Sequence, residues 1–138
     1  MAEAQTMWLC RCGYLNPGRK PLVYVAGPIT GDPWGCVRRA THAAAILGDL
    51  GCHAYLPQLS VLHEMVDPQP YEHWIEHGLA MIERCDGILR LPGESPGADR
   101  EQSHAERLGL PWHYGDADDT TDLFTLFIEQ VHARAAQR

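Results

Sequence analysis

Ser95, Gly97 and Glu101 lie within one short stretch that follows an apolar run. A glycine lets the backbone approach a ligand closely, and a serine hydroxyl can both donate and accept hydrogen bonds. A glutamate in the first turn of a helix complements the helix dipole, and such a carboxylate is also suited to attack an anomeric carbon. The stretch therefore indicates nucleophilic chemistry on a sugar, with a plain structural role for Glu101 as the alternative.

A second loop with glycines at both ends runs from Gly27 to Gly31, between an apolar run and a predicted helix. Backbone N–H groups and the helix dipole at such a place can hold a phosphate. Tight glycine turns also join strands to helices in many α/β proteins that bind no phosphate. Both interpretations stay open for this loop.

Two patterns have partial metal-binding character. His73, Glu76 and His77 match the H-x-x-E-H pattern of inverted zinc peptidases, but that chemistry needs a third ligand and a much larger chain. Cys10 and Cys12 resemble half of a zinc knuckle, and no second cysteine pair follows them. We expect no metal and no cofactor, and we expect the two histidines to lie on a solvated or pocket-lining face of a helix.

The elements that position these residues alternate between strands and helices. Apolar runs predict strands at residues 22–26, 53–56, 86–91 and 111–114. Helical periodicity predicts helices at residues 33–51, 71–84, 98–108 and 122–136, the first of them with Asp32 as N-cap and Pro33 as its first residue. Residues 57–70 contain three prolines and are predicted to form a long binding loop.

This alternation predicts a small doubly wound α/β fold of the flavodoxin or Rossmann-like kind, with a parallel sheet and helices on both faces. In strand order 2-1-3-4, the loops at residues 27–31 and 92–97 face each other at the switch point, where α/β sheets bind ligands. We expect Glu101 in an exposed first turn of the helix that follows the second loop.

The chain has 138 residues, which suits one domain over residues 21–138 after a lead-in at residues 1–20. Its net charge of −7 disfavours binding to nucleic acid polymers or to an anionic membrane. No apolar run is long enough to cross a membrane, and no secretory signal precedes the domain. Five cysteines, an odd number, suit reduced thiols, so we expect a cytoplasmic protein.

From Leu22 to Tyr114 the chain resembles the nucleoside 2-deoxyribosyltransferase family, including its hydrolase relatives, the 2′-deoxynucleoside 5′-monophosphate N-glycosidases. Three motifs carry the resemblance, in the family's order: YVAGPITG at residues 24–31, Cys85-Asp86 at the opening of a strand, and LPGESPGADRE at residues 91–101. The resemblance implies cleavage of the N-glycosidic bond of a (deoxy)nucleoside or its 5′-monophosphate, with water or a second base as acceptor.

The resemblance also implies roles for individual residues. Glu101 is the implied nucleophile, and Tyr24 would orient its carboxylate or contact the sugar. Residues implied to line the pocket for the sugar or its 5′ end are Gly27, Pro28, Ile29 and Thr30, and those implied to contact a 5′-phosphate are Ser95 and Gly97. Family pockets are completed by a neighbouring subunit, which implies a homodimer or a larger even-numbered assembly with Trp74 as an anchor or, alternatively, as a core residue.

Position 78 departs from the family pattern, because Gly78 stands where the family usually has an aspartate. His77 or Glu94 would then handle the leaving base, or the chain would be a nucleotide sensor without catalysis. The loop also loosely resembles that of phosphoribohydrolases that release cytokinin bases, although Glu94 replaces one of its glycines. We expect Asp86 to be a structural cap far from the pocket, and Arg100 to be a phosphate candidate.

Overall fold

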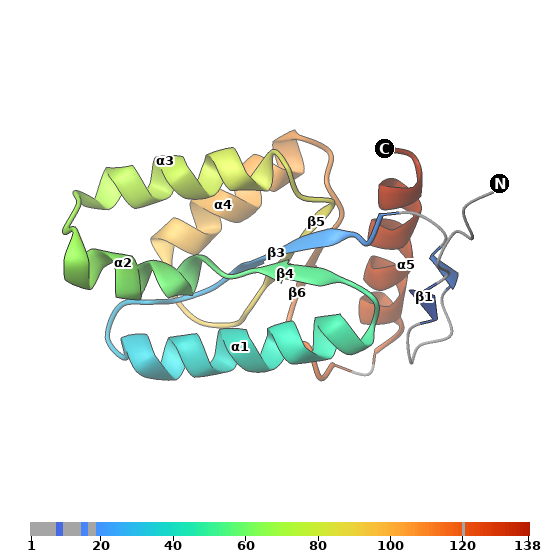
Figure 1. Ribbon diagram of the computed structural model, residues 1–138, viewed down its shortest axis with the longest axis horizontal. Helices are drawn as coiled ribbons and strands as arrows, with labels where there is room; N and C mark the ends of the chain where they lie inside the picture. Colours follow the sequence, from blue (N-terminus) through green and yellow to red (C-terminus); the bar gives the residue numbers. More distant parts are fainter. Residues whose placement is uncertain (1–7, 10–14, 17–18, 120) are drawn as a thin grey trace, which may run out of the picture.

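A four-stranded parallel sheet forms the centre of the computed structural model, which describes residues 8–9, 15–16, 19–119 and 121–138. Its strands are β3 (Leu22–Ala26), β4 (His53–Tyr55), β5 (Gly87–Arg90) and β6 (Trp112–Tyr114). They lie in the order β4-β3-β5-β6 and every neighbouring pair is parallel. In chain order this is 2-1-3-4, so the predicted sheet is confirmed (Figure 1).

Helices cover both faces of the sheet, as predicted. The helices α1 (Pro33–Asp49) and α5 (Asp122–Ala136) pack on one face, and α3 (Tyr71–Ile82) and α4 (Pro96–Arg107) pack on the other (Figure 1). Val23 and Val25 of β3 join the core beneath α1 and α5, whereas Tyr24 and Ala26 join the core beneath α3 and α4. A strand buried on both faces is apolar throughout, which is why residues 22–26 form an unbroken apolar run.

Side-chain caps set where two of these helices begin. Asp32 accepts a hydrogen bond from the Gly35 N–H at 3.0 Å, which confirms the predicted start of α1. Ser95 accepts one from the Ala98 N–H at 3.1 Å, and α4 therefore begins at Pro96, two residues before the predicted start. Glu101 thus lies in the second turn of α4, and it is buried, so the expected exposed first turn is wrong.

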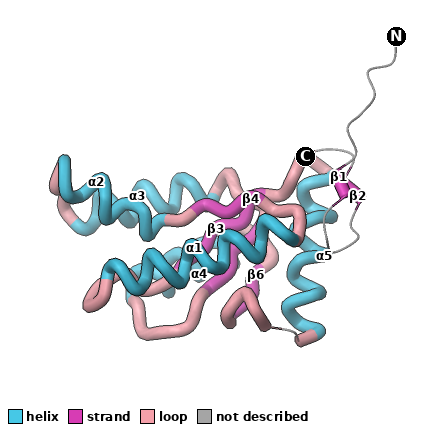
Figure 2. Tube along the Cα trace, turned by 60° about the horizontal axis from the view of Figure 1, so that its bottom comes forward, coloured by secondary structure: helices cyan, strands magenta, loops and turns pink. Residues whose placement is uncertain are grey.

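The predicted loop at residues 57–70 is wrong over its first two thirds. Residues Pro57–Leu59 form a 3-10 turn and Ser60–Val66 form α2. The prolines bracket the helix instead of interrupting it, because Pro57 opens the turn and Pro68 follows the end of α2. Figures 1 and 2 show α2 beside α3 at the end of the molecule remote from the C-terminus.

The lead-in contains two short strands, β1 (Trp8–Leu9) and β2 (Leu15–Asn16), which pair antiparallel. Cys10 and Cys12, the half zinc knuckle of the sequence, lie outside the described residues. Within the parts of the chain that the structure describes, no helix combines the length and the apolar character that crossing a membrane requires.

Asp86 ties the amino ends of the strands to the end of the chain. Its carboxylate is fully buried and accepts hydrogen bonds from the Leu22 N–H at 2.8 Å, from Arg19 at 2.8 Å and from Arg138 at 3.1 Å. Burial raises the pKa of Asp86, but the hydrogen bonds from the Leu22 N–H and the two guanidinium groups lower it by more. The resulting pKa lies below the usual range for an aspartate. This position and these contacts agree with the expected structural cap.

Replacing Asp86 by Asn is expected to lower the free energy of unfolding by about 1–3 kcal/mol at pH 7, because the amide loses the charge that both arginines contact. The depressed pKa means that the contribution is complete above the ordinary aspartate pKa of about 4 and is lost as the pH falls through the folded-state value. Urea unfolding at pH 7 and below pH 4 measures both effects. The exposed Asp118→Asn variant is the control, and equal stability of the two variants at pH 7 would contradict the assignment.

Candidate active site

A cavity of about 950 Å³ opens at the carboxyl ends of the strands, between α2, α3 and the start of α4. This is the switch point of the sheet, where ligands bind in doubly wound folds. Tyr24 lies directly behind the cavity, and Arg100 does not line it. The other site residues expected from the sequence all do: Gly27, Pro28, Ile29, Thr30, His77, Glu94, Ser95, Gly97 and Glu101. The fold therefore gathers three separate stretches of sequence around one space.

Tyr24 and Glu101 form a buried hydrogen-bonded pair at the wall of the cavity. The Tyr24 hydroxyl donates to Glu101 Oε1 at 2.7 Å. Tyr24 is fully buried in the central strand β3, and Glu101 on α4 is 7 % exposed. Burial and the nearby Glu101 charge both raise the pKa of Tyr24, so the phenol keeps its proton and acts as a fixed donor.

Glu101 is poised between its charged and neutral forms. Burial raises its pKa to about 7, although the hydrogen bond from Tyr24 and the charge of Arg90 both act to lower it. The carboxyl group is therefore close to half ionised at neutral pH. A perturbed carboxyl group at the wall of a large cavity is typical of a functional site.

Gly78 leaves the space that the pair occupies. A Cβ at this position would lie 2.6 Å from the Tyr24 hydroxyl and 2.9 Å from Glu101 Oε1. Any side chain here, including the aspartate usual in the family that the sequence resembles, would push these two groups away. The departure at position 78 is thus matched to the close approach of α3 to Tyr24 and Glu101.

A second tyrosine packs behind the Tyr24–Glu101 pair and lines the cavity. Tyr55 of β4 stacks on Tyr24 with ring centroids 5.4 Å apart, and its hydroxyl lies 3.0 Å from His77 Nε2. Burial raises the pKa of Tyr55. Sequence reasoning did not identify Tyr55, although the parallel register that pairs it with Tyr24 could have indicated it.

Arg90, at the end of β5, fixes the loop that leads into α4. It is 2 % exposed, and its guanidinium donates to the carbonyl oxygens of Leu91 and Gly93 and pairs with Asp99 at 2.9 Å. These contacts hold both ends of the loop whose helix carries Glu101. Sequence reasoning missed this role because a single arginine in an apolar strand gives no sign of which carbonyl groups it will reach.

The His73, Glu76 and His77 pattern does not gather a metal-ligand set in the described residues, and Cys10 and Cys12 lie outside those residues. His77 bonds Tyr55, and His73 packs edge-on against Trp74 with ring centroids 4.8 Å apart. Over the described parts of the chain, no group of three or more His, Cys, Asp or Glu side chains could hold a metal ion. The absence of a metal requirement remains an expectation.

Basic side chains lie outside the cavity. Arg100 is exposed and pairs with Glu72 at 2.9 Å, so the expectation that it meets a phosphate finds no support. Arg39 on α1 donates to the Pro92 carbonyl from outside the loop, and Arg38 is exposed. The described residues that line the cavity include neither lysine nor arginine. A ligand would meet neutral donors, two imidazoles and three carboxylates.

Most of the folded domain matches a known protein-family model. The model of a family described as a domain of unknown function (DUF4406) matches residues 21–114. The matched segment contains all four strands of the parallel sheet and every residue that lines the cavity. No curated protein sequence matches the chain.

The Tyr24→Phe variant is expected to have a Glu101 pKa above about 7. The hydrogen bond from Tyr24 stabilises the charged carboxylate, and the variant lacks that bond. Carbon-detected NMR titration of the glutamate carboxyl groups measures this pKa. Tyr55→Phe is the matched control, since it removes a neighbouring hydroxyl but leaves the bond between Tyr24 and Glu101 in place. A Glu101 pKa that stays the same or falls in Tyr24→Phe would show that the pair is not coupled.

Proposed function

The chain belongs to the DUF4406 family, a domain of unknown function, and we propose from its site that it cleaves the N-glycosidic bond of a (deoxy)nucleoside or nucleoside 5′-monophosphate, with Glu101 as the covalent nucleophile. The observation that carries this proposal is the buried Glu101 carboxyl group, held by Tyr24 at the wall of a cavity large enough for such a ligand. The order and spacing of the motifs shared with the 2-deoxyribosyltransferases support the same reaction.

In the first step, an ionised oxygen of Glu101 forms a bond to the anomeric carbon. The C–N bond to the base breaks, and its electron pair leaves with the base, which takes up a proton. Tyr24 holds Oε1 by its hydrogen bond, so Oε2 is the oxygen that we expect to attack. A fixed donor on one oxygen orients the other and removes a conformational cost from the attack.

In the second step, water or a second base attacks the same carbon and releases the sugar from Glu101. Two displacements in succession retain the configuration at that carbon. His77 is the group that we assign to move the protons, because it lies at the cavity and its Nε2 is held by the Tyr55 hydroxyl. Glu94, in the facing loop, is the other candidate for this role.

The 5′ end of the substrate would meet neutral hydrogen-bond donors. Ser95 uses its oxygen as an acceptor for the Ala98 N–H, which leaves its own proton to donate to a ligand. Gly97 leads the backbone past the cavity, and the loop from Gly27 to Thr30 lies opposite. These groups suit a 5′-hydroxyl or a phosphate bound at the start of a helix.

We assign this activity to the cytosol. The three cysteines within the described residues, Cys36, Cys52 and Cys85, are free thiols, and free thiols persist in reducing compartments.

Replacing Glu101 by Gln is expected to reduce release of free base about 1,000-fold or more, because the amide cannot form the glycosyl intermediate. Chromatography of a panel of deoxynucleosides and their monophosphates measures the released base. Glu106→Gln, an exposed position on the same helix, is the control. For the unmodified protein, kcat/KM is expected to rise with pH through about 7, since the nucleophile must be ionised.

Other outcomes would direct the assignment elsewhere. Unchanged turnover in Glu101→Gln would rule out this nucleophile. Nucleotide binding without release of base would support a sensor, the alternative that Gly78 raised. Loss of activity on chelation, with rescue by zinc, would revive the metal interpretation of His73, Glu76 and His77.

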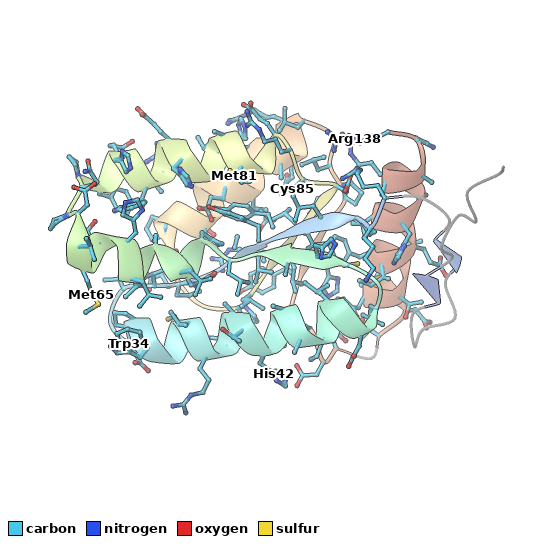
Figure 3. The ribbon with its side chains drawn as sticks, viewed as in Figure 1. Trp34, His42, Met65, Met81, Cys85 and Arg138 are labelled. Atoms are coloured by element: carbon cyan, nitrogen blue, oxygen red, sulfur yellow. The ribbon has the colours of Figure 1, made fainter. Side chains whose placement is uncertain are left out.

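The expected assembly also has a candidate surface. Helix α2 has no buried residue, and apolar side chains are exposed on and beside it: Leu59, Leu62, Met65 and Val66. Trp34 and Met65 project at the same end of the molecule (Figure 3). Trp74 is half-buried against the cavity, so it is not a fully buried core residue, and its role as an anchor of the assembly stays a prediction. We therefore propose that a second copy covers α2 and completes the cavity.

Light scattering at micromolar concentration is expected to give the mass of a dimer or a larger even-numbered assembly. Val66→Glu is expected to lower that mass, because it places a charge in the apolar contact. Leu123→Glu, an exposed position on α5, is the control. A one-chain mass in an active preparation would show that the cavity is complete within one chain.

A further inference from the structure

Glu64 is a cavity-lining carboxylate whose role the proposed mechanism does not use. It lies on α2, in the segment that the sequence predicted as a loop. Its Oε2 accepts hydrogen bonds from the Trp74 indole N–H at 2.6 Å and from the Gln69 N–H at 3.0 Å. The carboxylate is therefore fixed by two donors on one oxygen.

The other oxygen of Glu64 has no such partner. Within the described residues, no hydrogen bond reaches Oε1. A carboxylate oxygen has more than one acceptor site and is costly to leave unsatisfied when a ligand excludes water. A ligand that fills the cavity therefore binds well only if it donates an N–H or O–H to this oxygen, because desolvation of an unpaired carboxylate oxygen weakens binding.

Packing holds Trp74 in one orientation, and Trp74 in turn orients the Glu64 carboxylate. Three imidazole rings pack edge-on around its indole, those of His63 at 5.0 Å, His73 at 4.8 Å and His77 at 6.3 Å between ring centroids. Its N–H is occupied by Glu64. The ring and the carboxylate thus form one rigid polar corner of an otherwise largely apolar cavity.

Helix α3 relates this corner to Glu101. Trp74 and Gly78 lie four residues apart on α3 and so on the same face of the helix. Four residues correspond to a rise of about 6 Å along the helix axis. Gly78 packs against Glu101, and Trp74 holds Glu64, so the two carboxyl groups lie against different turns of the same helix face. Both line the cavity, and a sugar carbon at Glu101 would allow its base to extend toward Glu64.

The acidic lining of the cavity favours a base whose outer edge carries a hydrogen-bond donor. Three carboxylates line the cavity, those of Glu64, Glu94 and Glu101, and within its described lining there is no lysine or arginine to neutralise them. Adenine and cytosine present an exocyclic amino group, whereas a carbonyl oxygen takes that place in hypoxanthine and uracil. A carbonyl oxygen would meet the lone pairs of Glu64 and leave two acceptors unpaired.

We propose that Glu64, oriented by Trp74, selects substrates whose base presents an exocyclic amino group and discriminates against bases that carry a carbonyl group there. This inference rests on the proposed glycosidic cleavage and adds the class of leaving base to it. Glu64 is a binding residue in this assignment and takes no part in the attack on the sugar.

The test compares kcat/KM for deoxyadenosine against deoxyinosine and for deoxycytidine against deoxyuridine, each also as the 5′-monophosphate. The amino member of a pair that is cleaved is expected to be preferred about 10- to 100-fold. In Glu64→Gln the ratio is expected to fall to one or below, because the amide oxygen keeps the hydrogen bonds from Trp74 and Gln69 and the amide nitrogen then faces the ligand as a donor. Trp74→Phe, which keeps a ring but loses the N–H, is expected to lower the ratio in part.

The matched control is Glu129→Gln, the same substitution on the exposed face of α5, which is expected to leave the ratio unchanged. The ratio separates recognition from a structural role, since a merely loosened fold would lower both rates of a pair together. Two results would overturn the inference while leaving the proposed cleavage intact. One is a preference of the unmodified protein for the carbonyl bases, and the other is a preference for the amino bases that persists in Glu64→Gln.

Calorimetric binding of free adenine, hypoxanthine, cytosine and uracil covers the case in which no glycoside is cleaved. Selective binding of adenine or cytosine that is lost in Glu64→Gln would uphold the role of Glu64 and reject the cleavage reaction. Equal binding of amino and carbonyl bases, or no binding of any, would reject the role of Glu64 as well.

Discussion

The buried hydrogen bond between Tyr24 and Glu101 is the contact around which the rest of the site is arranged. It joins the central strand to α4, and it leaves no room for a side chain at position 78 of α3. One donor and one acceptor thus fix how closely two helices approach the sheet. The cavity lies directly against this contact, so its floor is as rigid as the core beneath it.

Keeping an ionisable group in this place costs stability, and the sign of the cost follows from its pKa. The folded state raises the pKa of Glu101 to about 7, above the ordinary glutamate value of about 4.3. Folding is therefore favoured by the protonated form at low pH, and that advantage is lost as the pH rises through the folded-state value. At neutral pH the folded protein therefore keeps a buried carboxyl group near its pKa. This group lowers the stability of the fold relative to an apolar side chain in the same place. A cost of this kind is common where a group must react.

The charged groups at the two ends of the sheet have different surroundings. At the amino ends, Asp86 keeps its charge because a backbone N–H and two arginines surround it, and it serves only to join strands. At the carboxyl ends, the terminal nitrogens of Arg90 donate to loop carbonyl groups and to Asp99, and Arg90 is not among the described residues that line the cavity. The carboxyl groups at the two ends thus have pKa values that shift in opposite directions: hydrogen-bond donors lower that of Asp86, and burial raises that of Glu101.

The sequence by itself determined the positions of the four strands and the loops that follow them, because apolar runs and glycine or proline boundaries are local signals. The alternation of strands and helices indicated the parallel sheet, and its order, inferred by analogy with flavodoxin-like sheets, is confirmed by the structure. The sequence also identified the two loops that line one side of the cavity, since both follow strands that must end at the same edge, but it missed most of the lining that residues 54–75 contribute. It failed at residues 57–70, where three prolines outweighed a short helical pattern, and it placed Glu101 at the surface because the cap at Ser95 shifts α4 by half a turn.

Only the tertiary structure decided which side chains meet. The stacking of Tyr55 on Tyr24 and the indole bond that orients Glu64 join residues that are far apart in the chain or lie in an element that the sequence did not predict. Arg90 reaches carbonyl groups that are near in sequence, but only the folded loop turns them toward its guanidinium group. The raised pKa of Glu101 and the need for Gly78 depend on burial and on distances of a few ångströms. Such quantities arise from packing between elements, and no local pattern in the chain encodes them.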